Sequence, residues 1–351
     1  MRKWSIFVLS LTLSGALSAK SVEFIGVIPV VISASDDLKP YAGRKSQVVF
    51  VQNIHLSSNA QRVLKARLDH ISEDIGLGAI HGVPTRVNLG MNGTPVLDQG
   101  AHGSCVTFAM TGAFDAVLGK GDYISQLCSL ELGAYLYQHG RSDYSGWNGS
   151  MGTVVLKQLN DYGVVPKSYQ QEYGCAGVKH YPLRTASNTG KPMSISEYTA
   201  NSIPLSFATW QVLADTEEVF SNNFNPVALL RTVKKHLREG HRVTLGILLD
   251  DTSGEAGALA TYKKAYDTWV LTPEIIKKMK QGGMQAGHEM IIIGYDDYAV
   301  AYTKDGKPSK GVFIVRNSWG KQSGDSGNFY ISYDYFKALC DEAQVIIPRK
   351  R

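Results

Sequence analysis

The chain lacks the features that mark several large classes of protein. Beyond its first 19 residues it has no uninterrupted apolar run of about 18 residues, which a membrane-spanning helix requires. It has no glycine-rich phosphate-binding loop, and its net charge of +5 is spread along 351 residues without basic blocks. We therefore expect no cofactor, no metal and no nucleic acid partner. Two histidines, His236 and His241, flank a Leu-Arg-Glu-Gly segment. Their spacing is more typical of surface residues than of a metal site.

The first 19 residues are typical of a signal peptide. Arg2 and Lys3 precede the apolar run Trp4 to Leu17, and small residues ending at Ala19 follow as a cleavage region. We therefore expect a secreted protein, extracellular or periplasmic, with no membrane attachment once the signal is removed.

Cysteine is scarce, with four in the whole chain. An oxidising compartment favours a disulfide, and Cys128, Cys175 and Cys340 allow one bridge that leaves one thiol over. The sequence alone does not determine which two cysteines form the bridge.

The fourth cysteine, Cys105, follows a glycine-rich turn and precedes a helix-like apolar run. A helix N-terminus lowers the pKa of a thiol placed there, which favours the nucleophilic thiolate. Gln99, a short loop upstream, can aim a side-chain N–H at the oxygen of a tetrahedral intermediate. The alternative is a buried structural cysteine, because free cysteine is among the most buried residue types.

Two later apolar runs favour the catalytic interpretation. His288 opens the run 290–295, and Asn317 ends the run 312–316. The polar insert 304–308 is typical of a hairpin loop, so the two runs can pair as strands and bring the histidine near the asparagine. The histidine would then accept the thiol proton while the asparagine fixes its tautomer.

In this order, Cys105, His288 and the segment Asn317-Ser318-Trp319-Gly320 resemble the motifs of papain-like cysteine peptidases. The resemblance implies that Cys105 is the nucleophile, that His288 is the general base and that Asn317 orients it. It also implies that Gln99 completes the oxyanion hole. The expected substrate is a peptide or protein, and the expected assembly is a monomer.

The resemblance implies a substrate cleft as well. The residues that match cleft positions of the family are Asn148, Gly149, Ser150, Gly152, Ala286, Gly287 and Trp319. The match over 148–150 is weaker, and its alternative is an ordinary turn. Gly152 and Ala286 are small and stand at the second specificity pocket, which implies room for a bulky apolar side chain. Trp319 would shield the histidine–asparagine hydrogen bond from water.

The departures from the family pattern are informative. Val106 stands where an aromatic residue is usual, and His102 stands where many members have a half-cystine, so that disulfide is absent. We interpret His102 as a solvent-facing loop residue. The nucleophile and base are farther apart than the roughly 130 to 150 positions typical of the family, which implies insertions. Residues 176–225 and 250–286 are the candidates.

Periodicity predicts a helical first half and a strand-rich second half, and hence an α+β protein. The family resemblance implies a papain-like two-lobed fold, in which a cleft separates a helical lobe from an antiparallel, barrel-like β lobe. The expected helices are 105–118, 130–138, 152–162 and 273–280, and the expected strands are 243–249, 289–295, 312–317 and 328–332.

Residues 20–80 show a pattern that differs from that of the catalytic region. The β-branched runs 22–33 and 47–56 predict a hairpin, and a helix follows, capped by Ser57 or Ser58. We interpret this segment as a pro-region that covers the cleft and inhibits the catalytic domain, residues 83–351. Cleavage would fall in the glycine-rich linker 76–82. The alternative is a permanent accessory domain.

Other functions remain open at this stage. A cysteine acyltransferase or peptidoglycan amidase uses the same dyad, and a catalytically silent papain-like protein would use the fold as a binding scaffold. Exopeptidase action would follow if the insertion 176–225 or 250–286 blocked one end of the cleft.

Overall fold

The computed structural model describes residues 20–32, 47–71, 83–184, 191–250, 255–283 and 286–349. The predicted signal peptide and the predicted cleavage linker lie outside these ranges. No helix in the described ranges is long and apolar enough to cross a membrane.

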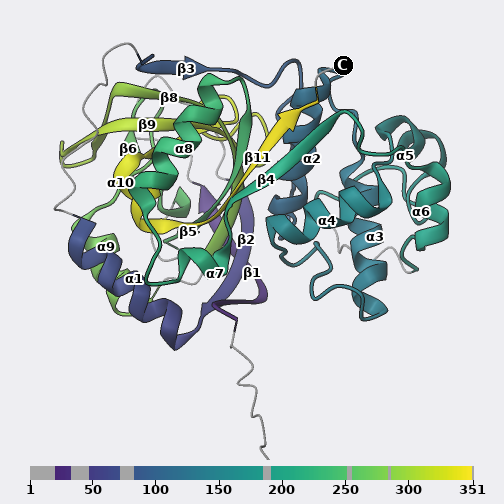
Figure 1. Ribbon diagram of the computed structural model, residues 1–351, viewed down its shortest axis with the longest axis horizontal. Helices are drawn as coiled ribbons and strands as arrows, with labels where there is room; N and C mark the ends of the chain where they lie inside the picture. Colours follow the sequence, from purple (N-terminus) through teal and green to yellow (C-terminus); the bar gives the residue numbers. More distant parts are fainter. Residues whose placement is uncertain are drawn as a thin grey trace, which may run out of the picture.

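A group of helices occupies one side of the molecule, on the right in Figure 1. It comprises α2 (Cys105–Leu118), α3 (Gln126–Gln138), α4 (Gly152–Tyr162), α5 (Lys167–Tyr173) and α6 (Ile195–Asn201). Helix α2 is apolar on nearly every face, and its first twelve residues are all buried, as expected of a helix enclosed on all sides. It packs against α3, α4 and the sheet. The nucleophile candidate is therefore carried by the most enclosed helix of this group.

Strands make up the other side of the molecule. One path of neighbours runs β4 (Ala208–Ala214), β11 (Cys340–Pro348), β5 (Arg242–Leu249), β8 (Ala286–Thr303), β6 (Ala260–Thr261), β7 (Thr268–Trp269), β10 (Asn328–Ser332) and β9 (Pro308–Arg316). Strand β9 also pairs with β8, so the strands from β8 to β9 close into a barrel-like ring. The short strand β3 (Arg86–Asn88) adds to β8.

Four helices and a 3-10 turn surround these strands. They are α7 (Thr216–Val219), α8 (Pro226–Arg238), α9 (Pro273–Lys280) and α10 (Tyr333–Leu339), with the turn at Glu255–Gly257. Each helix begins where its sequence supplies a cap. Asn225, directly before Pro226, is an example: its side chain accepts hydrogen bonds from the backbone N–H groups of Val227 and Ala228.

The N-terminal segment forms the predicted hairpin and helix. Strands β1 (Val22–Ile32) and β2 (Gln47–Leu56) are antiparallel, and α1 (Ser58–His70) follows with Ser57 as its cap. In Figure 1 the purple hairpin lies between the helical and strand-rich sides. It is tied to the latter because Gln52 and Asn53 pair with Gly287 and Ala286 of β8.

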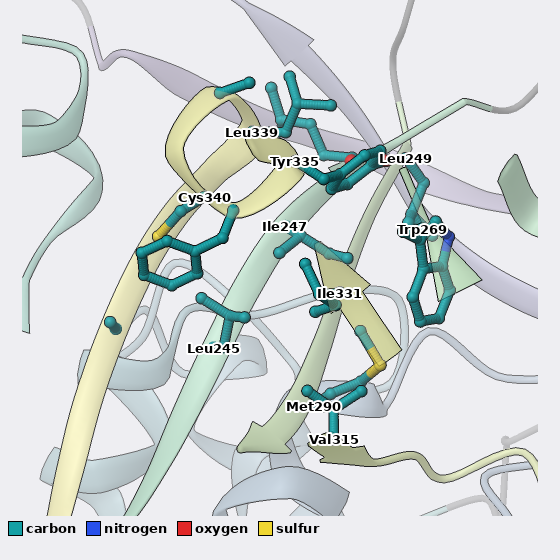
Figure 2. Packing of buried hydrophobic residues seen from close by; sticks show 14 of the residues in the cluster. Leu245, Ile247, Leu249, Trp269, Met290, Val315, Ile331, Tyr335, Leu339 and Cys340 are labelled. Carbon is teal, nitrogen blue, oxygen red and sulfur yellow. The ribbon is translucent and has the colours of Figure 1, made fainter. Parts of the chain in front are cut away.

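The largest apolar cluster lies inside the strand-rich side. Figure 2 shows part of it, with Trp269, Met290, Val315 and Ile331 converging from several strands. Buried side chains of the hairpin belong to the same cluster: Val22, Val30, Val49, Val51, Ile54 and Leu56. The hairpin is therefore packed into the core of the molecule.

The α+β prediction is confirmed, and several boundaries agree closely. Helices α2, α4 and α9 and strand β10 have the predicted limits, while β8 continues well beyond the predicted strand. Strands β4 and β11 and helices α8 and α10 had no counterpart in the prediction.

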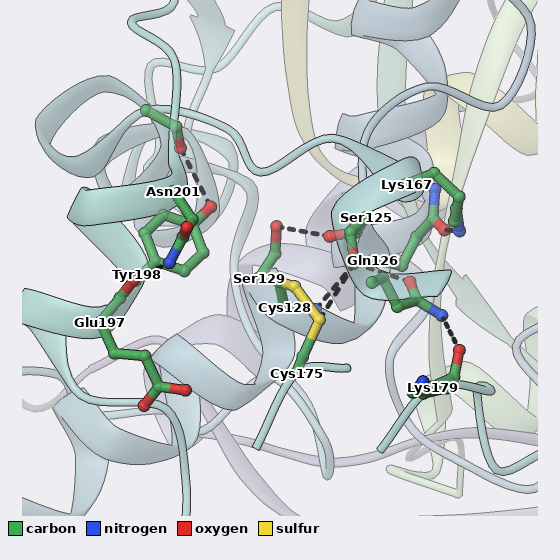
Figure 3. The surroundings of a disulfide bond; sticks show 12 residues. Ser125, Gln126, Cys128, Ser129, Lys167, Cys175, Lys179, Glu197, Tyr198 and Asn201 are labelled. Carbon is green, nitrogen blue, oxygen red and sulfur yellow. Dashed lines mark hydrogen bonds between the residues drawn. A yellow bond between two sulfur atoms is a disulfide. The ribbon is translucent and has the colours of Figure 1, made fainter. Parts of the chain in front are cut away.

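The structure also shows which cysteines form the disulfide whose pairing the sequence left open. Cys128 in α3 bonds to Cys175, which follows α5, across 47 positions of sequence (Figure 3). Cys105 and Cys340 are buried thiols. The bond closes a loop within the helical side.

We expect loss of this disulfide to destabilise the chain. Replacing both partners, as Cys128→Ser with Cys175→Ser, should lower the free energy of unfolding by about 4 kcal/mol, because the cross-link removes entropy from an unfolded loop of this length. Urea unfolding measures the change, and Cys340→Ala is the control that removes a thiol without a cross-link. A double variant as stable as the control would contradict the prediction.

Candidate active site

Cys105 is the first residue of α2 and is fully buried. Burial raises the pKa of its thiol to about 12, and a hydrogen bond with the backbone of Glu289 acts in the opposite direction. Glu289 directly follows His288, so the thiol lies beside the strand that carries the candidate base. The expected lowering of the thiol pKa by the helix is outweighed here, because the thiol is shielded from water.

His288 and Asn317 meet where β8 and β9 run side by side, as the hairpin argument predicted. The distance from His288 Nε2 to Asn317 Oδ1 is 2.7 Å. The backbone N–H of Ser318 also donates to Asn317 Oδ1, at 2.7 Å, so this atom is an acceptor. His288 must therefore donate from Nε2, which leaves the lone pair on Nδ1.

The imidazole of His288 is enclosed. The indole of Trp319 stacks on it with ring centroids 4.4 Å apart, and Nδ1 has no hydrogen-bond partner among the described residues. Burial lowers the pKa of His288 to about 4, against the weaker effect of the Asn317 hydrogen bond. The thiol and the imidazole are therefore both neutral in this state, with an acceptor nitrogen ready for a proton.

The side-chain amide of Gln99 is held in one orientation. Its Oε1 accepts from Ser318 Oγ at 2.7 Å, and its Nε2 donates to the carbonyl of His102 at 2.8 Å. The second Nε2 hydrogen remains, and it points at a backbone oxygen of β2, the carbonyl of Phe50, at 3.0 Å. An oxyanion donor needs this kind of fixed N–H. The orienting role of Ser318 was missed in the sequence, although the residue belongs to the quoted motif.

The N-terminal hairpin lies directly over these residues. Gln52 donates from its side chain to the carbonyl of Ser150 at 3.3 Å. A Cβ on Gly149 would lie 3.1 Å from the ring of Phe24, and one on Gly103 would lie 2.5 Å from a methyl of Val27. The hairpin therefore fits closely against the loop before α2 and the loop before α4.

The predicted cleft residues divide into two groups. Gly149, Ser150, Ala286 and Gly287 lie against the hairpin, through the contacts and strand pairing given above. The others do not touch it in any described contact: Asn148 is exposed, Trp319 lies behind His288, and Gly152 donates its N–H to the carboxylate of Glu342.

The interpretation of His102 as a solvent-facing loop residue is wrong. Its side chain is buried, with Nε2 2.5 Å from the carbonyl of Pro182 and its ring edge-on to Trp147 and Tyr181. Burial lowers the pKa of its imidazole. The aromatic partners lie far along the chain, which is why the local sequence gave no sign of them.

A group of buried carboxylates beside the site had no signal in the sequence. Glu289, Asp341 and Glu342 converge on Gly246, where a Cβ would lie 2.2 Å from Asp341 and 3.0 Å from Glu289 carboxylate oxygens. Burial and mutual repulsion raise the pKa of Glu289 and Asp341 well above the usual range, and burial raises that of Glu342 to about 7. Protonated carboxyls therefore stabilise this group.

Comparison with known proteins agrees with this arrangement. Residues 253–347 match the family described as papain family cysteine protease, a stretch that contains His288 and Asn317. Thiol protease aleurain from Arabidopsis thaliana is 23% identical over 256 residues, which cover 70% of this chain and 54% of aleurain. The chain thus spans about half the length of that relative.

Solved structures with a similar course of the chain have low identity. Xylellain, a cysteine protease from Xylella fastidiosa, is 18% identical with a TM-score of 0.49, over 80% of this chain and 93% of xylellain. The clostridial cysteine protease Cwp84 after propeptide cleavage is 20% identical with a TM-score of 0.46, over 73% of this chain and 56% of Cwp84. The family match covers about a quarter of the chain, and together with the relative it shows that the chain is similar to the papain-like cysteine peptidases.

The buried carboxylates generate a pH-dependent stability. Glu342 has a raised pKa in the folded chain, of about 7 against 4.5 for the free side chain, so its contribution is fully present below about pH 4.5 and is lost as the pH rises through 7. We expect Glu342→Gln to remove this loss, which is on the order of 3 kcal/mol between pH 4.5 and 8.

Urea unfolding at several pH values, in the Cys105→Ala background to prevent self-digestion, measures the effect. Glu197→Gln, at an exposed carboxylate of α6, is the matched control. The same pH slope in Glu342→Gln and in the parent would contradict the prediction.

Proposed function

We propose that the chain is a cysteine peptidase that hydrolyses peptide bonds with Cys105, His288, Asn317 and Gln99. The observation that supports this proposal is the fixed tautomer of His288. Its Nε2–H donates to Asn317, and its buried Nδ1 lone pair has no hydrogen-bond partner in the part of the chain that the structure describes. In this orientation, His288 can accept a proton only at Nδ1, from a group that faces that nitrogen.

The chemistry then follows from these groups. His288 takes the proton of Cys105, and the thiolate attacks the carbonyl carbon of a peptide bond. Gln99 Nε2–H and the N–H of Cys105 stabilise the oxyanion. The imidazolium donates its proton to the leaving amine, and a water molecule, activated by the same imidazole, hydrolyses the acyl-enzyme. Asn317 keeps the ring in place throughout.

We further propose that the segment 20–80 is an inhibitory pro-region. The support is the carbonyl of Phe50, which receives the Gln99 N–H that an oxyanion would need. Strand β2 also pairs with Gly287 and Ala286 and bonds Ser150 through Gln52, so it covers the surface on which a substrate strand would lie. We assign substrate binding to these residues and to Gly149, with Asn148, Gly152 and Trp319 at the margins of the cleft.

The same cover accounts for a latent nucleophile. Because Cys105 and His288 are fully enclosed, their pKa values of about 12 and about 4 disfavour the charged pair. Water reaching the site would relieve the desolvation that causes both shifts. Removal of the hairpin therefore opens the cleft and favours the thiolate.

We also propose that the protein is exported. The predicted signal peptide 1–19 supports this, and a disulfide between Cys128 and Cys175 suits an oxidising compartment.

Loss of the nucleophile and loss of the oxyanion donor should differ in degree. Cys105→Ala should leave almost no turnover of a fluorogenic peptide, whereas Gln99→Ala should lower kcat by about a hundred- to thousandfold and leave residual activity. Gln138→Ala, at an exposed glutamine of α3, is the control. A Gln99→Ala enzyme with the kcat of the control would remove Gln99 from the mechanism.

The inhibitory role of the hairpin predicts slow alkylation of Cys105 in the full chain. We would measure the rate with a thiol-reactive epoxide and locate the label by mass mapping. Val51→Asp, in the buried core of β2, should speed the reaction about tenfold or more, because burying an unpaired polar group costs about 1 to 3 kcal/mol. Val48→Asp is the matched control, since Val48 is 54% exposed on the same strand.

The outcomes separate the alternatives. Equally fast labelling of the parent and both variants would make the segment 20–80 a permanent accessory domain. No labelling of Cys105 in any of them, even after proteolysis in the linker 76–82, would favour a silent binding scaffold.

A further inference from the structure

Three potential metal ligands meet at the C-terminal end of α8, outside the catalytic groups. The Nδ1 atoms of His236 and His241 lie 3.4 Å apart, and Glu239 Oε2 lies 3.3 Å from the first and 3.6 Å from the second. All three residues retain some exposure. The sequence suggested that these histidines are ordinary surface residues, and their side chains are in fact largely enclosed, at 13% and 19% exposed.

The backbone holds this cluster together. Gly240 has a left-handed φ of 86°, and the N–H of His241 donates to the carbonyl of His236 at 2.9 Å. The chain thus ends the helix with a tight turn that returns His241 to the side of His236. Arg242 then starts β5, which is buried along its whole length. The spacing of the two histidines is therefore set by a closed turn between two packed elements.

The three distances also match those expected between neighbouring ligand atoms of a bound cation. Tetrahedral bonds of about 2.1 Å from nitrogen or oxygen to Zn²⁺ place neighbouring ligand atoms about 3.4 Å apart. The cluster matches one face of such a tetrahedron and leaves the fourth position to water.

Charge supports the same conclusion. Glu239 is the C-cap of α8, where the helix dipole disfavours a negative side chain, so it contributes little to the helix itself. Its other oxygen, Oε1, lies 3.9 Å from Lys235 Nζ, while Oε2 faces the imidazoles.

We propose that His236, Glu239 and His241 form a binding site for a first-row divalent cation, with Zn²⁺ as the best fit. Two imidazole nitrogens and one carboxylate oxygen are a donor set that Zn²⁺ takes readily. The bound ion would join the end of α8 to the start of β5 and stabilise the strand-rich side of the molecule.

Calorimetric titration of the full chain with Zn²⁺ tests the proposal. The Cys105→Ala background is used because a free catalytic thiol can itself bind Zn²⁺. We expect one equivalent to bind and to raise the Tm. His236→Ala and His241→Ala should each weaken binding by at least the roughly 10- to 100-fold that loss of an outer-shell partner costs, because each removes a direct ligand. His180→Ala, at an exposed histidine elsewhere, should bind as the parent does.

Two results would overturn the site. One is the absence of saturable Zn²⁺ binding in the parent, with Co²⁺ giving no tetrahedral absorption in the visible region. The other is binding that survives unchanged in both histidine variants, which would place the ion elsewhere. Circular dichroism of each variant establishes that a loss of binding is not a loss of fold.

Discussion

The hydrogen bond between His288 and Asn317 is the constraint on which the proposed chemistry depends. It sets the tautomer only because Ser318 N–H donates to the same oxygen and thereby prevents Asn317 from turning its amide nitrogen toward the ring. Strands β8 and β9 supply the two partners, and Trp319 covers the bond from one side. The three residues Asn317, Ser318 and Trp319 thus orient and cover the proposed base, His288. Ser318 also donates a hydrogen bond to Gln99, the proposed oxyanion donor.

The N-terminal hairpin lies against this site and places the carbonyl of Phe50 on Gln99. Cys105 and His288 are both buried, and their burial shifts both pKa values away from the charged pair. A helix N-terminus normally favours a thiolate. Here the cost of burying a charge exceeds that preference. In the proposed mechanism, the same residues would therefore serve a latent state and a reactive state, which differ in the access of water to the site.

The sequence predicted those parts of the fold and site that local signals determine. Helix α2, the β8–β9 pairing and the hairpin followed from apolar periodicity and turn residues. The segments around His288 and Asn317 pointed to the proposed base and its partner. Contacts between distant segments had no such signal. The burial of His102 depends on Trp147, Tyr181 and Pro182. The carboxylate group depends on β5, β8 and β11 meeting at Gly246, and no local pattern shows where three strands will converge.

The attachment of the hairpin bears on how the cleft could open. Its apolar side chains belong to the main core, and Arg67 of α1 donates to the carbonyls of Ala338 and Val219 while its guanidinium lies over the ring of Phe224. These contacts do not depend on the covalent linker 76–82.

A cut there would leave the segment bound at first and would only end the high effective concentration that the linker provides. Release would then depend on the loss of apolar burial, at roughly 25 cal/mol per Å². If the segment is the proposed pro-region, activation would therefore take two steps, a cleavage and a dissociation, and the second would have to overcome the burial of Val49, Val51 and Ile54 in the core.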